Sequence, residues 1–176
     1  PQQVADFLSD SSPESRERLI DRLLSSPRFG ERWGRHWLDL ARYADSNGLD
    51  ENFLFREAWR YRNWVIDASN ADMPFDRFVL EQLAGDRLPF DSIEQRDRQR
   101  IAAGFLVIGP KVLLGDGTPK QRMEIADEQI DTLTQGVLGM TVALTTRSGD
   151  GTPTMSISYR DEFCTHVRLT GAAVSE

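Results

Sequence analysis

The fold of this chain is decided by residues 36–89, HWLDLARYADSNGLDENFLFREAWRYRNWVIDASNADMPFDRFVLEQLAGDRLP. Together with the few residues before them, they contain all four Trp residues and two of the three Tyr residues. Many of these aromatic residues recur at spacings of three or four, which places them on one face of an α-helix. Short polar runs interrupt the pattern at 45–53 and before Pro74. The stretch therefore predicts helices joined by turns.

The same periodicity predicts a mainly α-helical, compact multi-helix domain of about seven helices over residues 1–140. A capping-box pattern, Ser92 with Gln95, marks one helix start, and Gly85 marks a helix end. Residues 141–176 are rich in Thr, Ser and Gly, and we expect them to form an irregular, loosely packed tail. The expected helices cover residues 2–8, 13–25, 27–44, 57–69, 74–84, 92–105 and 122–138.

The core of this domain should form where the aromatic helices meet. We expect the helix that carries Trp33 and Trp37 to pack against the two helices that follow it. Those helices present Tyr61 and Trp64, and Phe75 and Phe78.

Composition excludes several classes of protein. The chain has 176 residues, a net charge of −7 and no run of about 18 apolar residues, so nucleic acid is an unfavourable partner and a membrane span is not expected. Its single cysteine, Cys164, can form neither an internal disulfide nor a multi-thiolate zinc site.

The polar run DSNGLDE has two interpretations. Asp45, Asn47, Asp50 and Glu51 bring four oxygen-bearing side chains into seven residues, which suits a hard cation such as Ca²⁺. The spacing differs from that of an EF-hand, and Asp and Asn in such a run also favour turns by bonding nearby backbone N–H groups. The turn interpretation is the stronger of the two.

Four residues are candidates for a ligand or partner surface: His36, Trp59, Arg60 and Arg62. Interleaved aromatic and Arg side chains are typical of stacking platforms and of protein interfaces. The alternative is structural, because Tyr61 and Trp64 of the same helix form an apolar stripe, and His36 lacks a metal-binding or catalytic partner in sequence.

An acidic row lies near the end of the helical region and is expected to form a solvated helix face. Its members are Glu124, Asp127, Glu128 and Asp131. The sequence contains neither a GxSxG nucleophile elbow nor a phosphate-binding glycine loop. No catalytic residue can therefore be assigned.

Several long sequence segments within residues 19–140 resemble a domain of unknown function found in large planctomycete-type proteins. The matching words are SPRFGERWGRHWLDLARYADSNG, AWRYRNWVIDASNADMPFDRFVLEQLAGDRLP and EQIDTLTQGVLGMTV. In that family the domain accompanies a cytochrome c-like domain, usually in secreted or surface proteins. The resemblance implies an extracytoplasmic chain whose partners are other domains of the same larger protein.

The chain departs from this family after residue 141. The family continues into a CxxCH word, whereas this chain reads VALTTRSGDGTPTMSISYRDEF. Haem chemistry can therefore be assigned to no residue here, and we expect the tail to be diverged or frame-altered. The favoured function is a structural or interaction module without haem of its own. The alternative is a cation-dependent hydrolase that acts on polysaccharide through the carboxylates of the 45–51 loop.

Overall fold

The computed structural model describes residues 2–48, 52–110, 117–146 and 153–158. Over these segments the chain is mainly helical, which confirms the predicted fold class and the seven expected α-helices. A 3₁₀ turn, η1, and two strands complete the described structure. The elements are α1 (Gln2–Ser9), α2 (Ser15–Leu24), α3 (Arg28–Leu40), α4 (Ala58–Asn70), α5 (Phe75–Ala84), α6 (Ile93–Ala102), η1 (Ala103–Leu106), α7 (Pro119–Leu138), β1 (Thr141–Thr146) and β2 (Pro153–Ser158).

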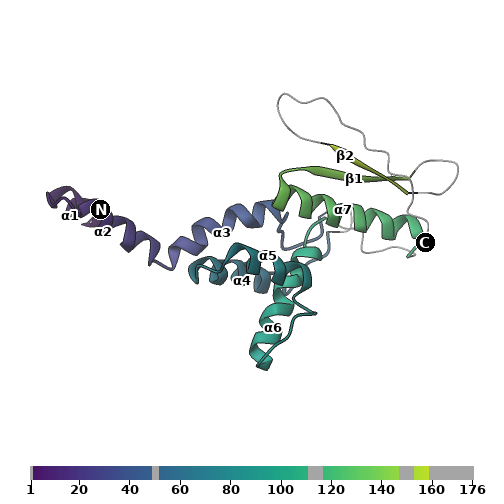
Figure 1. Cartoon of the computed structure of the whole chain (residues 1–176), viewed down its shortest axis with the longest axis horizontal. Coiled ribbons are helices and arrows are strands. Elements are labelled where there is room, and N and C mark those ends of the chain that lie inside the picture. Colours follow the sequence, from purple (N-terminus) through teal and green to yellow (C-terminus); the bar gives the residue numbers. More distant parts are fainter. Residues whose placement is uncertain (1, 49–51, 111–116, 147–152, 159–176) are drawn as a thin grey trace.

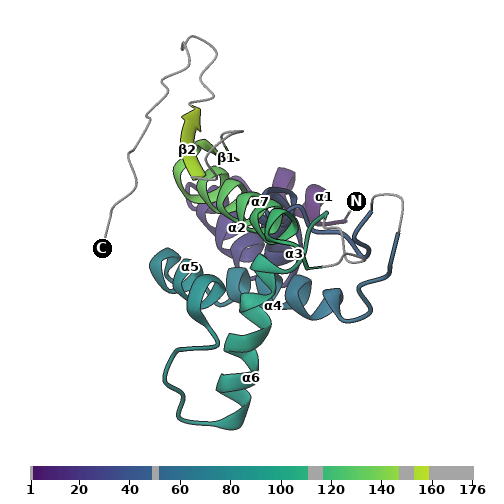
Figure 2. The same cartoon turned by 90° about the vertical axis from the view of Figure 1, so that its right-hand side faces the viewer.

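The helices are arranged as a central cluster with an arm (Figure 1). Helices α1 and α2 extend away from the cluster at the outer end of α3. Helices α4 and α5 lie beside α3, and α6 projects from them, as Figure 2 shows from the side. Helix α7 carries the two strands on its far side. Neither α1 nor α2 contains a buried residue, so the core is formed by the later helices.

The core lies where α4 meets α5, η1 and the end of α3. Tyr61 and Trp64 of α4 are buried, as the sequence predicts. The ring of Trp64 stacks on Phe78 at a centroid distance of 5.2 Å, and the edge of Trp37 meets Phe78 at 4.9 Å. Phe105 of η1 stacks on Trp37 at 5.8 Å. Aromatic packing of this kind stabilises a fold beyond the area that it buries.

One buried glutamine bonds two of the polar groups in this aromatic core, those of Trp37 and Tyr61. Gln82 Oε1 accepts hydrogen bonds from Trp37 Nε1 at 2.7 Å and from the Tyr61 hydroxyl at 2.6 Å. Its amide donates to the carbonyl of Phe78 at 3.0 Å. Burial raises the pKa of Tyr61 well above its ordinary value. The neutral phenol is therefore part of the folded structure.

Helix α3 packs on α4 through small residues, and only part of its row of aromatic side chains takes part in the contact. Gly30 is so close to α4 that an added Cβ would lie 2.4 Å from the Ile66 carbonyl oxygen. Gly34 is also buried, and Trp37 enters the core further along the helix. The prediction that Trp33 forms the core is wrong, because this side chain is 56% exposed. Close approach of the two backbones turns the Gly30 side of α3 inward and leaves Trp33 outside.

The ends of several helices differ from the prediction. The Ser92 hydroxyl caps α6 by accepting from Gln95 N, as expected. Helix α2 starts at Ser15, two residues later than expected. Helix α7 starts at Pro119 rather than at residue 122, because Thr118 accepts from the backbone N–H of Gln121. Thr followed by Pro is a helix-start signal that the sequence analysis missed.

The region after α7 is more regular than predicted. Strands β1 and β2 pair antiparallel, with Thr141 opposite Ser158 and Thr146 opposite Pro153. Strand β1 was not foreseen. Two segments of the expected tail therefore form strands. Residues 159–176 lie outside the described structure, and the division at residue 140 stays a prediction.

Candidate interaction surface

An exposed row of side chains runs along one side of α3. Phe29, Trp33, His36 and Leu40 follow each other at spacings of four, three and four, so they share one face of the helix. The ring centroids of Phe29 and Trp33 are 6.1 Å apart, and those of Trp33 and His36 are 5.3 Å apart. His36 and Leu40 are exposed, and Phe29 is half-buried. We call these four residues the aromatic face of α3.

The orientation of this face follows from the glycines on the adjoining side of the helix. At about 100° per residue, the aromatic face lies roughly a quarter turn from the side that holds Gly30 and Gly34. Because those glycines seat α3 on α4, the bulky rings are turned to solvent. At the start of the helix, Arg28 Nη1 pairs with Glu31 Oε2 at 2.7 Å.

Apolar exposure continues from α3 onto α2. No residue of α2 is buried. Ile20, Leu23 and Leu24 are all exposed, as is Leu8 of α1. A succession of exposed aliphatic and aromatic side chains on adjacent helices is unusual for a free surface and marks interaction sites.

The structure divides the predicted surface residues between two helices. His36 lies on α3 against Trp33, whereas Trp59 lies on α4 and is 43% exposed. The guanidinium of Arg60 covers the Trp59 ring at 4.9 Å and pairs with Glu57 Oε2 at 2.5 Å. This aromatic surface is thus already partly occupied by its own chain.

Arg62 takes a different position from its neighbours on α4. It is half-buried, and its guanidinium lies 3.4 Å from the Asn63 side-chain oxygen. Of the four residues predicted for a partner surface, only His36 lies on the aromatic face of α3.

The 45–51 loop is closed by its own side chains in the part that the structure describes. Asn47 is fully buried, and its Oδ1 accepts from Phe53 N at 2.6 Å. Asp45 Oδ1 accepts from the Tyr43 hydroxyl at 2.8 Å. Burial and this carboxylate raise the pKa of Tyr43 to about 12. These bonds support the turn interpretation of the loop.

The other two candidate cation ligands, Asp50 and Glu51, lie outside the described residues. Within the described segments, no group of three or more His, Cys, Asp or Glu side chains could hold a metal ion. The Ca²⁺ site therefore stays a prediction.

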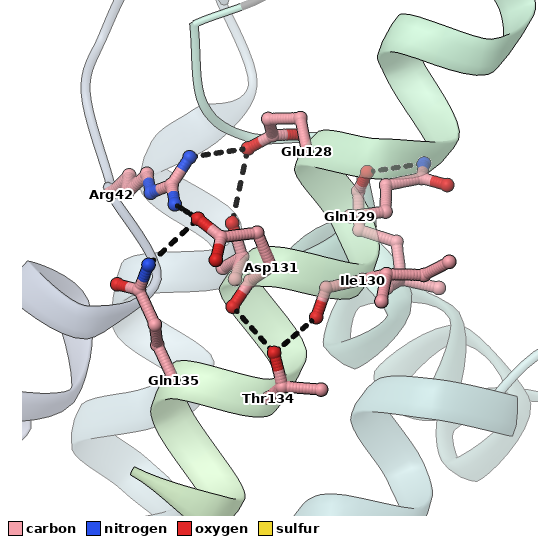
Figure 3. A network of polar contacts seen from close by, with 9 residues as sticks. Arg42, Glu128, Gln129, Ile130, Asp131, Thr134 and Gln135 are labelled. Atoms are coloured by element: carbon pink, nitrogen blue, oxygen red, sulfur yellow. Dashed lines mark hydrogen bonds and ion pairs between the residues drawn. The ribbon is translucent and has the colours of Figure 1, made fainter. Parts of the chain in front are cut away.

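A polar network between α3 and α7 was missed by the sequence analysis (Figure 3). Arg42, just after α3, pairs with Asp131 Oδ2 at 2.5 Å and with Glu128 Oε1 at 3.6 Å. Gln135 Nε2 also donates to Asp131 Oδ2, at 2.7 Å. The Glu128 and Asp131 side chains are only 16% and 19% exposed. The expectation that the whole acidic row faces solvent is therefore wrong for these two residues.

This network attaches α7 to the rest of the domain. Gln129 strengthens the attachment, because its amide donates to the Leu106 carbonyl of η1 at 2.8 Å. Arg42 adopts a positive φ of 53°, a conformation that is uncommon for a non-glycine residue. In the sequence, the acidic row was the one signal of the contact between Arg42 and α7. The position of Arg42 depends on how the chain leaves α3. The network is a structural attachment rather than a site open to ligand.

The fold and its exposed aromatic face define a small helical module. In the described part of the chain, none of the helices is long and apolar enough to span a bilayer. The chain belongs to the PSCyt2 family, described as a protein of unknown function (DUF1549), whose family model matches residues 1–145.

The family match confirms the resemblance seen in the sequence and extends it to the N-terminus. It ends within β1, close to the point where the chain departs from the expected family sequence. The searches of curated proteins and of solved structures found no match to this chain.

Proposed function

We propose that this chain is an interaction module that docks onto another domain through the aromatic face of α3. The observation that carries the proposal is the exposure of Trp33 beside Phe29 and His36 on a helix that is rigidly seated on α4. In this proposal the module has no haem of its own and belongs to a larger extracytoplasmic protein. Its membership of the PSCyt2 family supports this setting.

The chemistry of the aromatic face fits a protein partner. Trp is enriched among the residues that dominate binding energy, and a Trp on a fixed helix loses little conformational freedom on binding. A folded domain with a complementary apolar surface would remove the rings from water. Truncating such an anchor typically costs about 2 kcal/mol, or roughly 30-fold in Kd.

The partner that we propose is a cytochrome c-like domain of the kind that accompanies this family. This choice rests on the resemblance and can be tested directly. Haem quenches Trp fluorescence through space, so docking near Trp33 should quench the emission of this chain. The experiment titrates the purified chain with a separately produced cytochrome c-like domain and measures the Kd from the quenching.

A matched pair of variants separates the aromatic face from the other exposed Trp. Trp33→Ala should weaken binding roughly 30-fold, whereas Trp59→Ala removes a similar side chain from α4 and should leave the Kd unchanged. Because the variants also change the fluorescence, calorimetry should supply the Kd for each of them. Equal weakening by both variants, or undiminished binding of Trp33→Ala, contradicts the proposal. Self-association of the chain that Trp33→Ala abolishes would assign the face to a second copy instead.

The alternative function, a cation-dependent hydrolase that acts on polysaccharide, gains no support from the described part of the loop. Asn47 is buried and bonds Phe53, and Asp45 bonds Tyr43. Both side chains are thus used to shape the turn.

A further inference from the structure

A second row of exposed side chains runs along α3 beside the aromatic face. Each of its members precedes a member of the aromatic face by one residue, so the row lies about 100° around the helix, on the side away from Gly30 and Gly34. All four of its residues are exposed. We call this row, Arg28, Arg32, Arg35 and Asp39, the charged row of α3.

Arg32 is the member of the charged row that lies nearest to the aromatic face. It follows Phe29 by three residues and precedes His36 by four, and residues at these spacings are neighbours on the surface of a helix. Neither its guanidinium nor that of Arg35 forms an ion pair or a side-chain hydrogen bond with another residue that the structure describes. Arg28, in contrast, pairs with Glu31. Arg32 and Arg35 therefore present free donors at the border of the apolar surface.

The charged row is positive although the chain as a whole is acidic. The row has three Arg residues and one Asp residue, whereas the net charge of the chain is −7. Exposed charges that are more than about 8 Å apart are largely screened at physiological salt. A partner seated on the aromatic face would therefore experience the nearby guanidinium groups more strongly than the distant carboxylates of the chain.

We propose that the partner of the aromatic face presents an acidic border, in which carboxylates around its apolar site pair with Arg32 and Arg35. This inference rests on the function proposed above and specifies the chemistry of the partner surface. One guanidinium can donate two parallel hydrogen bonds to one carboxylate, which fixes orientation and adds energy. The aromatic face would then supply most of the affinity, and the charged row would supply orientation and fast association.

An acidic protein surface fits the charged row better than a polymer of phosphates does. Aromatic residues and Arg are both enriched in protein interfaces. Nucleic acids, in contrast, are held by many Lys and Arg contacts to phosphate. The row ends at Asp39, whose carboxylate would repel a phosphate backbone that followed the helix. The combination of an apolar row with two free guanidinium groups thus favours a folded protein partner.

The test measures association of the full chain with the cytochrome c-like domain proposed above, at about 50 mM and about 500 mM NaCl. Stopped-flow Trp quenching gives kon, and calorimetry gives Kd. The double variant Arg32→Glu, Arg35→Glu should lower kon roughly tenfold or more at the lower salt concentration. At the higher concentration its kon should approach that of the wild type, because salt screens exposed charges. Trp33→Ala should bind more weakly than the wild type at both concentrations, since an apolar contact is not screened.

The double variant Arg98→Glu, Arg100→Glu is the matched control. It changes the net charge of the chain by the same amount, but on α6, which projects from the central cluster (Figure 1). Both of these Arg residues are exposed. The control should associate as fast as the wild type, and circular dichroism checks the fold of each variant.

The proposal is overturned if the α3 double variant associates as fast as the wild type at the lower salt concentration, or faster. Equal slowing by both double variants also overturns it, because net charge alone would then explain the effect. So does binding to phosphatidylglycerol vesicles that only the α3 double variant loses, which would assign the charged row to a membrane surface.

The same experiment separates this inference from the function on which it rests. If the wild type does not bind the cytochrome c-like domain at either salt concentration, the proposed function fails and the acidic border fails with it. If binding is independent of salt but is weakened by Trp33→Ala, the proposed function stands and the acidic border alone is refuted.

Discussion

Replacement of Gly30 by alanine tests the packing that exposes the aromatic face. An alanine Cβ at this position would lie 2.4 Å from the Ile66 carbonyl oxygen and 2.7 Å from the Asn70 side chain. Since one neighbour is backbone, α3 must move away from α4. Such overpacking typically costs about 1–3 kcal/mol. The hydrogen bond from Gly30 N to Asn70 Oδ1, now 2.8 Å, would also be weakened, at a cost of about 1 kcal/mol.

One term opposes these costs. Alanine is favoured over glycine inside a helix by about 1 kcal/mol. The net expectation for Gly30→Ala is therefore a loss of about 2 kcal/mol in the free energy of unfolding. For a chain of this size that corresponds to a fall of roughly 4–8 °C in Tm. The assay is urea unfolding followed by far-UV circular dichroism, with thermal unfolding as a second measurement.

Gly136→Ala in α7 is the control for this experiment. A Cβ there would meet only Trp37 Cη2, at an ordinary distance of 3.8 Å. Propensity should then dominate, and the variant should gain about 1 kcal/mol. If Gly30→Ala is as stable as the wild type, or gains stability as Gly136→Ala does, the close approach of α3 and α4 is refuted. The reasoning that places Trp33 in solvent would fail with it.

Three further predictions concern the polar groups of the fold. Arg42→Ala should lower the free energy of unfolding by about 2–3 kcal/mol, because it removes the positive charge that pairs with two largely buried carboxylates. Arg42→Gly, which suits the positive φ of 53°, should be the more stable of the two variants by about 1 kcal/mol in urea unfolding. Asn47→Ala should cost about 1–3 kcal/mol and speed amide hydrogen exchange at Phe53, whose N–H loses its acceptor; unchanged exchange would contradict the loop-closing role. The pKa of Tyr61 is raised in the folded state above its ordinary value of 10.0, so the unfolded chain loses this proton first and stability should fall as the pH rises above 10.0. Tyr61→Phe should lose less stability than the wild type over the same pH rise, and an equal loss would count against this assignment.

The helical class and most helix positions could be predicted because they depend on local patterns. Spacings of three and four placed Tyr61 and Trp64 on one face of α4, and the structure buries both. The Ser92 cap was equally local, since its hydroxyl bonds a backbone N–H three residues away. The start of α7 at Pro119 was also local and could have been found from the preceding Thr118.

The candidate surface could be predicted only in part. The sequence singled out His36, but it placed Trp33 in the core, because an aromatic side chain on an apolar stripe is usually buried. The decisive signal was the pair Gly30 and Gly34, whose spacing of four lets two helix backbones approach closely. Which neighbour approaches is a tertiary fact, because Ile66 and Asn70 lie some 40 residues further along the chain.

By itself, the sequence determined the family, the helices and the aromatic character of the core. The helices and the core depend on the order of side chains over a few turns of helix. The family assignment depends on long sequence segments that match the family model. Only the tertiary structure decided that Arg42 neutralises Glu128 and Asp131 and that Trp33 faces solvent. The physical reason is that burial and charge pairing depend on which helices meet and at what distance, and helical periodicity gives a side chain its direction but not its neighbour.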